Sequence, residues 1–503
     1  MGDNNGTGNQ QAFGISIDVL PQAASKCFDD DGRLKRTGIV WTAGAHIITA
    51  AIGPGVLSLA WSIAQLGWIA GPAAMLLLSI VTYHTSTLLS ACYRSGDPNT
   101  GQRNYTYMDA VRSNLGGAKV KICVLIQFLY LFGVVVVNTI ATSISLMAIK
   151  RSNCFHHSRG KNGCHINSNP YMILFGVVQI ILSQIPNFDQ LWWFSIVADL
   201  MSFTFSIVAL GLDIVKVAGS SQFQFGGSLT GISIGSVTPT QKIWRSFQAL
   251  GNIASTYCYT ITLIDVQYFS KALFVELIDT VYNRTLIRSA PSEAETMKKS
   301  IRVTVAVTTF FYMFHGCVGY AAFGDFAPRN ILTGFGFYNP FWLLDIANTA
   351  VVIHLVVAYR VYCHLLFAFV EKLASEKFGA SKFITKEIIV PIPGFTPYKL
   401  NIFRLVWRTI FVTLATIISM LVQFVNVNDL VGILGAVGFG TFTVYFPIEV
   451  YIVQKKIPKW CARWVGLKIL CGACLIISIA GASGSFAAFL HDLEGYKPFK
   501  TRY

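Results

Sequence analysis

Long apolar stretches separated by short polar segments make up most of this chain of 503 residues. Residues 37–83 contain no Lys, Arg, Asp or Glu. Because about 20 apolar residues cross a ~30 Å hydrocarbon core, this stretch alone is long enough for two transmembrane helices. The pattern predicts an all-α polytopic membrane protein.

A window of about 19 residues predicts about eleven transmembrane helices between residues 38 and 490. The sixth is the weakest, because small and hydroxyl residues are frequent in it. A polar N-terminal tail precedes this domain over residues 1–37, and a short tail follows over residues 491–503. The helices are expected at 38–65, 70–93, 121–149, 170–186, 191–217, 243–267, 300–323, 341–369, 402–425, 429–453 and 464–490.

The net charge of +15 comes from Lys and Arg that lie between the apolar stretches. They form no single basic face, so the expected partner is a lipid bilayer and not a nucleic acid. With the N-terminal tail cytosolic, most of these residues fall on cytosolic segments, as the positive-inside rule requires. An odd number of helices then makes the C-terminal tail extracellular. The oligomeric state does not follow from the sequence.

Cys154 and Cys164 follow the third predicted helix in an extracellular loop, where oxidising conditions allow a disulfide. Two unrelated thiols are the alternative. The cysteines show no spacing typical of a metal site, and no nucleotide-binding or catalytic motif is found, so neither a metal nor an enzymatic activity is expected. No cofactor is expected.

The first predicted helix contains Gly53-Pro54-Gly55 near its middle. Proline lacks an N–H donor, and flanking glycines disfavour a continuous helix further. In lipid, such a break is tolerated only where protein or water satisfies the freed backbone groups. We therefore expect the helix to unwind beside an internal cavity, although a kink that serves only packing is the alternative.

An unwound helix presents partial charges to a substrate. The N–H groups of Gly55, Val56 and Leu57 begin the second half and favour a carboxylate. The carbonyl groups from Thr49 to Ile52 end the first half and favour an ammonium group. One break can therefore bind both ends of a zwitterion.

The sixth predicted helix has a similar interruption at Gly251, followed by Asn252, Ser255, Thr256 and Tyr257. Interruptions in the first and sixth helices predict two inverted repeats of five helices plus one extra helix, with the substrate between the repeats. Asn252, Ser255, Thr256 and Tyr257 are therefore candidate substrate-binding residues.

His46 lies two turns before the first break and is a candidate for proton coupling, because histidine titrates near physiological pH. A neutral histidine bonded to a nearby hydroxyl or carbonyl group is the alternative.

Several long motifs resemble plant amino acid permeases of the amino acid/auxin permease family. They are RTGIVWTAGAHIITAAIGPGVLSLAWSIAQLGW (36–68), ACYRSGDPNTGQRNYTYMDAVRSNLGG (91–117), GYAAFGD (319–325) and LTGFGFYNPFWLLDIAN (332–348). The resemblance covers nearly the whole chain beyond the N-terminal tail. It implies a LeuT-like fold of eleven helices and proton-coupled amino acid uptake at the plasma membrane.

Some residues depart from the family pattern. Pro54 replaces a serine and Asn252 replaces an aspartate, while Asp265 stands where a glutamate is expected and is the second proton-coupling candidate. Residues 268–278 look like an insertion, either a harmless loop or translated intron.

We predict a secondary active transporter that couples amino acid symport to protons. The alternatives are a divergent, weakly active or non-transporting sensor-like relative, and a carrier of auxin or another carboxylate.

Overall fold

The computed structural model describes residues 40–96, 101–159, 166–185, 192–219, 226–264, 293–336, 341–378, 381–390 and 398–494. Nearly all of these residues are helical, with two short antiparallel hairpins. The predicted N-terminal tail and the last nine residues lie outside the description.

Eight described segments are long and apolar enough to cross a membrane, and α5 is a shorter apolar helix. The all-α polytopic class is thus confirmed, while the total of about eleven helices stays a prediction. Helix α2 consists of two helices that meet at Gly67, where φ is 82° and ψ is 177°. This positive φ suits glycine, and it separates the first two predicted helices close to the expected place.

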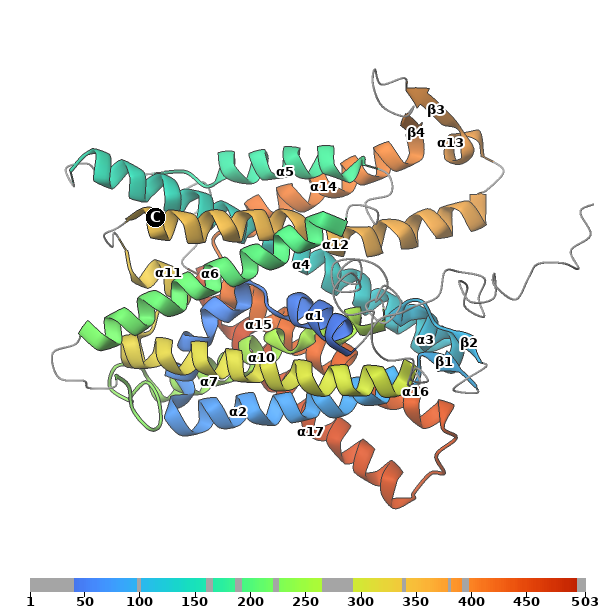
Figure 1. Ribbon diagram of the computed structural model, residues 1–503, viewed down its shortest axis with the longest axis horizontal. Helices are drawn as coiled ribbons and strands as arrows, with labels where there is room; N and C mark the ends of the chain where they lie inside the picture. The colour runs from blue at the N-terminus through green and yellow to red at the C-terminus, as the bar shows by residue number, and fades with distance from the viewer. Residues whose placement is uncertain are drawn as a thin grey trace, which may run out of the picture.

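Figure 1 shows the helices and strands, which run in chain order from α1 to α17. They are α1 (Val40–Ala51), η2 (Pro54–Ser58), α2 (Leu59–Ser90), β1 (Arg94–Ser95), β2 (Gln102–Arg103), α3 (Tyr107–Asn114), α4 (Ala118–His157), α5 (Asn169–Ser183), α6 (Trp192–Gly219), α7 (Pro239–Thr256), η4 (Cys258–Thr262), α10 (Glu293–Phe323), η5 (Gly324–Phe326), α11 (Ile331–Gly334), α12 (Phe341–Phe378), α13 (Lys382–Thr385), β3 (Glu387–Val390), β4 (Tyr398–Asn401), α14 (Ile402–Val422), α15 (Val427–Gly438), η6 (Phe439–Tyr445), α16 (Phe446–Gln454) and α17 (Ala462–Glu494).

The interrupted helices lie in the middle of the bundle. Figure 1 shows α5, α12 and α14 along one side and α2, α10 and α17 along the other, with α1, α7 and α15 between them. Helix α10 packs against α1 and α2, while α7 packs against α2, α15 and α17. Internal placement supplies the protein contacts that a broken helix needs in lipid.

Glycines allow α7 to approach its neighbours closely. A Cβ added at Gly251 would lie 2.7 Å from the carbonyl oxygen of Gly432 on α15. On the other side, a Cβ added at Gly481 of α17 would lie 3.0 Å from Cα of Gly251. The weak hydropathy of this predicted helix therefore reflects close backbone packing, which requires small residues.

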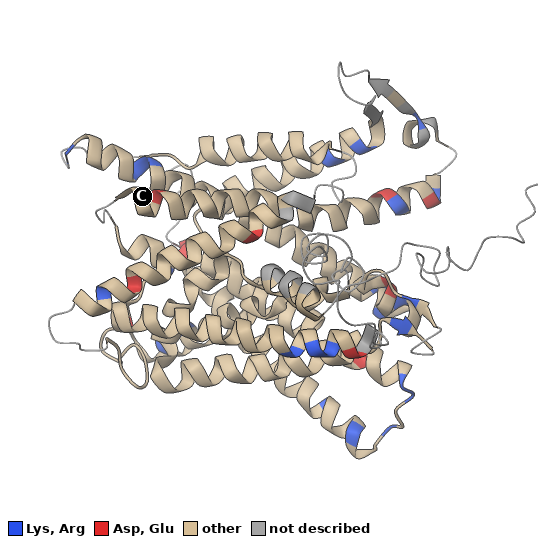
Figure 2. Ribbon diagram, in the orientation of Figure 1, with Lys and Arg blue, Asp and Glu red and all other residues tan. Residues whose placement is uncertain are grey.

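Charged residues gather mainly near the ends of the helices, and the helix middles carry few of them (Figure 2). We call one end of the bundle the basic end. Helix α16 contacts Arg94 through Gln454 and Lys119 through Glu449, and Arg94 pairs with Arg103 in the β1–β2 hairpin. Lys459 follows α16 along the chain, and Lys299 lies one turn before Arg302, which lies beside Tyr83 near the end of α2. Between the two ends the outward side chains are large and apolar, among them Ile80, Leu129 and Ile476. This distribution is typical of a lipid-embedded protein.

Candidate functional site

The predicted break in the first helix is confirmed. Helix α1 ends at Ala51, and Gly53 is extended, with φ of −122° and ψ of −176°. The chain then begins the short 3-10 helix η2 at Pro54, where a missing N–H is tolerated because no helical bond needs it. Two helical halves are thus joined by an unwound segment.

Some of the backbone groups expected to bind substrate already have partners. Of the N–H groups expected to bind the carboxylate, that of Val56 donates to the carbonyl of Gly53 over 3.2 Å. Leu57 lies further into η2, where N–H groups bond back along the helix. The first hydrogen bond of η2 is the one from the N–H of Val56. The N–H of Gly55 comes before it in the chain, so it is the donor left at the positive end of the second half-helix.

The second interruption lies elsewhere than the sequence predicted. Helix α7 continues through Gly251 and ends at Thr256, and Tyr257 leaves the helix with φ of −101° and ψ of 7° before η4 begins. The prediction at Gly251 was wrong because that glycine serves close packing against α15. Asn252 follows it inside α7, and its side chain is turned toward Gly432 of α15.

The two breaks face each other across the centre of the bundle. A Cβ added at Gly55 would lie 3.4 Å from Cγ2 of Thr256 and 4.0 Å from Oγ of Ser255. The hydroxyl of Ser255 donates to Asn252 O over 2.7 Å, and that of Thr256 donates to Ile253 O over 2.8 Å. The structure therefore brings together two segments that lie about two hundred residues apart, as the paired interruptions led us to expect.

Tyr312 of α10 connects the two breaks, and the sequence analysis did not identify it. Its hydroxyl lies 2.6 Å from the carbonyl oxygen of Ala51 and 3.2 Å from that of Thr256. These carbonyls belong to the last residues of α1 and α7. Tyr312 is 1% exposed, and its ring packs edge-on against Tyr257 at 5.5 Å. No motif surrounds Tyr312, and α10 contains several other polar residues, so no signal in the sequence distinguished it.

His354 of α12 was also missed. A Cβ added at Gly53 would lie 3.9 Å from its Nε2. Its Nδ1 lies 2.7 Å from Oγ of Ser202, and that hydroxyl donates to Ala198 O over 3.0 Å. Nδ1 also lies 3.1 Å from Ala198 O, which can only accept, so Nδ1 carries the proton. In a neutral ring the lone pair of Nε2 then faces the break.

The remaining candidates lie partly outside the description. The side chains of His46 and Thr49 in α1 are not described, and neither is any part of Asp265. Cys154, near the end of α4, forms a disulfide whose partner lies outside the described residues. Its pairing with Cys164 stays a prediction.

A buried ion pair joins both interrupted helices to α15 at the end of the bundle opposite the basic end. Arg329 lies 2.5 Å from the carboxylate of Asp429, which is fully buried at the start of α15. Gln248 of α7 donates to the same carboxylate. The guanidinium of Arg329 also lies 5.3 Å from the ring of Trp61, in the helix that follows η2.

A second ionic cluster joins three elements at the basic end. Glu449 of α16 lies between Lys119 at the start of α4, 2.6 Å away, and Lys468 of α17. The carboxylate of Glu449 is largely buried. Ionic contacts therefore connect the helices on both sides of the paired breaks.

The profile of the family described as "Transmembrane amino acid transporter protein" matches residues 36–490. The chain belongs to this family. Two curated members from Arabidopsis thaliana are similar along almost their whole length. Amino acid permease 3 is 62% identical over 97% of this chain and 98% of its own length. Amino acid permease 2 is 62% identical over 96% of this chain and 94% of its own.

Two solved structures trace a similar path but share far less sequence with this member of the transmembrane amino acid transporter family. The nucleobase-cation-symport-1 family transporter Mhp1, closed with bromovinylhydantoin bound, gives a TM-score of 0.48 at 12% identity, covering 91% of this chain and 92% of its own. MhsT in complex with L-phenylalanine gives a TM-score of 0.46 at 11% identity, covering 91% of this chain and 98% of its own.

Proposed function

We propose that this transporter is a proton-coupled symporter that carries amino acids across the plasma membrane, with its N-terminus cytosolic and its C-terminus extracellular. Membership of the transmembrane amino acid transporter family supports the substrate class. The observation that carries the proposal is the meeting of Gly55 and Thr256, the ends of two half-helices, inside the bundle.

In the proposed complex the two ends of the amino acid bind the two breaks. The substrate carboxylate accepts from the N–H of Gly55 at the positive end of η2. The ammonium group donates to the carbonyls of Ala51 and Thr256. A carbonyl has two lone pairs and Tyr312 has one hydroxyl proton, so both carbonyls keep accepting capacity beside that tyrosine.

His354 is the proposed proton acceptor among the described residues. Its Nε2 faces Gly53, so a proton taken up there lies beside the proposed substrate site. The bond from Nδ1 to Ser202 holds the ring in this orientation. Protonation and substrate binding would then occur at adjacent positions, so each can change the free energy of the other.

Alternating access requires the bundle to open at one end while it stays closed at the other. The Arg329–Asp429 pair closes the end opposite the basic end, and the Glu449 cluster connects helices at the basic end. In the proposed cycle the two sets of contacts break alternately.

The test is uptake of a panel of labelled amino acids into yeast that lacks its own permeases, at two external pH values. We expect uptake that rises at lower external pH and falls when a protonophore removes the gradient. Uptake that ignores the gradient would contradict the coupling, and failure to take up any amino acid would contradict the transport itself.

A carrier of other carboxylates, or a non-transporting relative, is the rival that Pro54 motivates, because proline removes one N–H from the proposed carboxylate site. Pro54→Ser restores that donor. If this variant leaves the rate and the substrate range unchanged, the rival loses its support, whereas amino acid uptake that appears only in the variant would favour the rival.

A further inference from the structure

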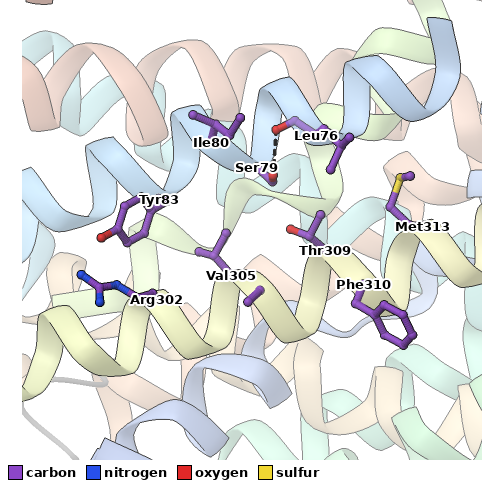
Figure 3. Close-up of a pocket in the computed structure, with 10 residues that line it drawn as sticks. Leu76, Ser79, Ile80, Tyr83, Arg302, Val305, Thr309, Phe310 and Met313 are labelled. Atoms are coloured by element: carbon purple, nitrogen blue, oxygen red, sulfur yellow. Dashed lines mark hydrogen bonds between the residues drawn. The ribbon is translucent and has the colours of Figure 1, made fainter. Parts of the chain in front are cut away.

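A groove of about 660 Å³ runs along the outside of the bundle between α2 and α10 (Figure 3). Its walls are two helical stripes, spaced three or four residues apart on each helix. Several wall side chains face outward and are well exposed, such as Ile80 at 66% and Phe310 at 72%. The groove therefore opens toward the lipid and not toward the paired breaks.

The two ends of the groove differ in chemistry. Arg302 and Tyr83 lie at one end, and Leu76 and Met313 lie at the other, as Figure 3 shows. Arg302 belongs to the first turns of α10, one turn after Lys299, and it lies beside Tyr83 near the end of α2 that leads to Arg94 at the basic end. Arg302 is exposed, and no carboxylate among the described residues pairs with it. One end is thus cationic and the rest is largely apolar.

The length of the groove matches one leaflet of a bilayer. From Arg302 to Met313 the wall covers eleven steps along α10, which correspond to about 16 Å at ~1.5 Å per residue. The hydrocarbon core is about 30 Å thick, so half of it is about 15 Å. A transmembrane helix of a partner or of a second copy would need an apolar surface roughly twice as long.

We propose that this groove binds a phospholipid with an anionic headgroup from the leaflet at the basic end. The headgroup phosphate pairs with Arg302, and the hydroxyl of Tyr83 lies at the same end to share it. An acyl chain lies along Ile80, Val305 and Phe310 and ends near Met313. A guanidinium favours phosphate because its planar N–H groups bind two oxygens together.

The bound lipid contacts the helix that carries Tyr312. Thr309 and Met313 line the groove, and Tyr312 reaches the two breaks from the adjacent face of the same turn of α10. The lipid therefore supports α10 at the level of the paired breaks, and its affinity is expected to change when that helix moves.

The experiment uses the full-length protein in detergent and titrates dioleoyl-phosphatidylglycerol, with dioleoyl-phosphatidylcholine as the neutral lipid, while the thermal midpoint is recorded. We expect the thermal midpoint to rise to a plateau as the anionic lipid is added. The neutral lipid should need at least a tenfold higher concentration for the same rise. Arg302→Gln should weaken the anionic response at least tenfold. Ala306→Trp, which fills the groove from an exposed wall position, should remove it.

Two control variants carry the same kinds of substitution outside the groove. Lys459→Gln removes an exposed cation from the same end, and Val307→Trp adds the same ring to the neighbouring exposed position outside the groove. Both should retain the wild-type response. Equal losses in Arg302→Gln and Lys459→Gln, an unaffected Ala306→Trp, or the same stabilisation by inorganic phosphate alone would each overturn the proposal.

Discussion

Tyr312→Phe removes one oxygen from the centre of the proposed site and leaves the ring in place. The hydroxyl holds the carbonyls of Ala51 and Thr256 at 2.6 Å and 3.2 Å. A buried hydrogen bond contributes about 0.5–1.5 kcal/mol, and a buried acceptor left without a partner costs about 1–3 kcal/mol. We expect the free energy that holds the two half-helices in their binding arrangement to weaken by about 1–2 kcal/mol.

The same loss should appear in substrate binding, because substrate must then order the two breaks itself. Since 1.4 kcal/mol corresponds to a factor of ten, KM for amino acid uptake should rise roughly 5–30-fold. The assay is the initial rate of uptake against substrate concentration at fixed external pH. Surface expression is measured in parallel so that changes in transporter number are separated from changes in KM.

Tyr320→Phe is the matched control on the same helix. Tyr320 is fully buried, and its hydroxyl lies 2.6 Å from Asp325 and 3.0 Å from the carbonyl of Ser228, away from both breaks. We expect a comparable decrease in the thermal midpoint but a KM close to that of the wild type. A KM for Tyr312→Phe within twofold of the wild type, or an equal rise in both variants, would refute the role given to Tyr312.

Three further predictions concern packing, coupling and the ion pair. Gly251→Ala should destabilise the protein by about 1–3 kcal/mol, because its Cβ would lie 2.7 Å from a backbone carbonyl, whereas Gly466→Ala has open space and should leave the thermal midpoint unchanged or slightly higher. His354→Gln should flatten the dependence of uptake on external pH, measured between pH 5 and 8; an unchanged profile would show that another group takes the proton. Asp429→Asn should lower the thermal midpoint, by about 2–3 kcal/mol in stability, because Arg329 loses its buried partner but is 31% exposed and can be hydrated. Adding Arg329→Gln to that variant should cost little more, and additive losses would contradict a direct pair.

The amino-acid sequence determined the features that depend on neighbouring residues. Apolar length predicts membrane-crossing helices, because a helix satisfies its backbone groups within one continuous apolar segment, whereas the strands of a membrane barrel are shorter and alternate in polarity. Gly53, Pro54 and Gly55 unwind the first helix at the expected place, because ring geometry and a missing N–H act within one turn. Ser255 and Thr256 were candidates because they follow Gly251, and they lie at the second break although that break is not at Gly251.

Tertiary structure alone decided how distant residues complete the site. Gly251 resembles a helix breaker, yet α15 packs against it, and the helix continues to Thr256. Tyr312 and His354 acquire their roles from the packing of α10 and α12 around the breaks. Contacts between residues more than fifty positions apart have no local signature, because they depend on which faces of the helices meet when the bundle packs.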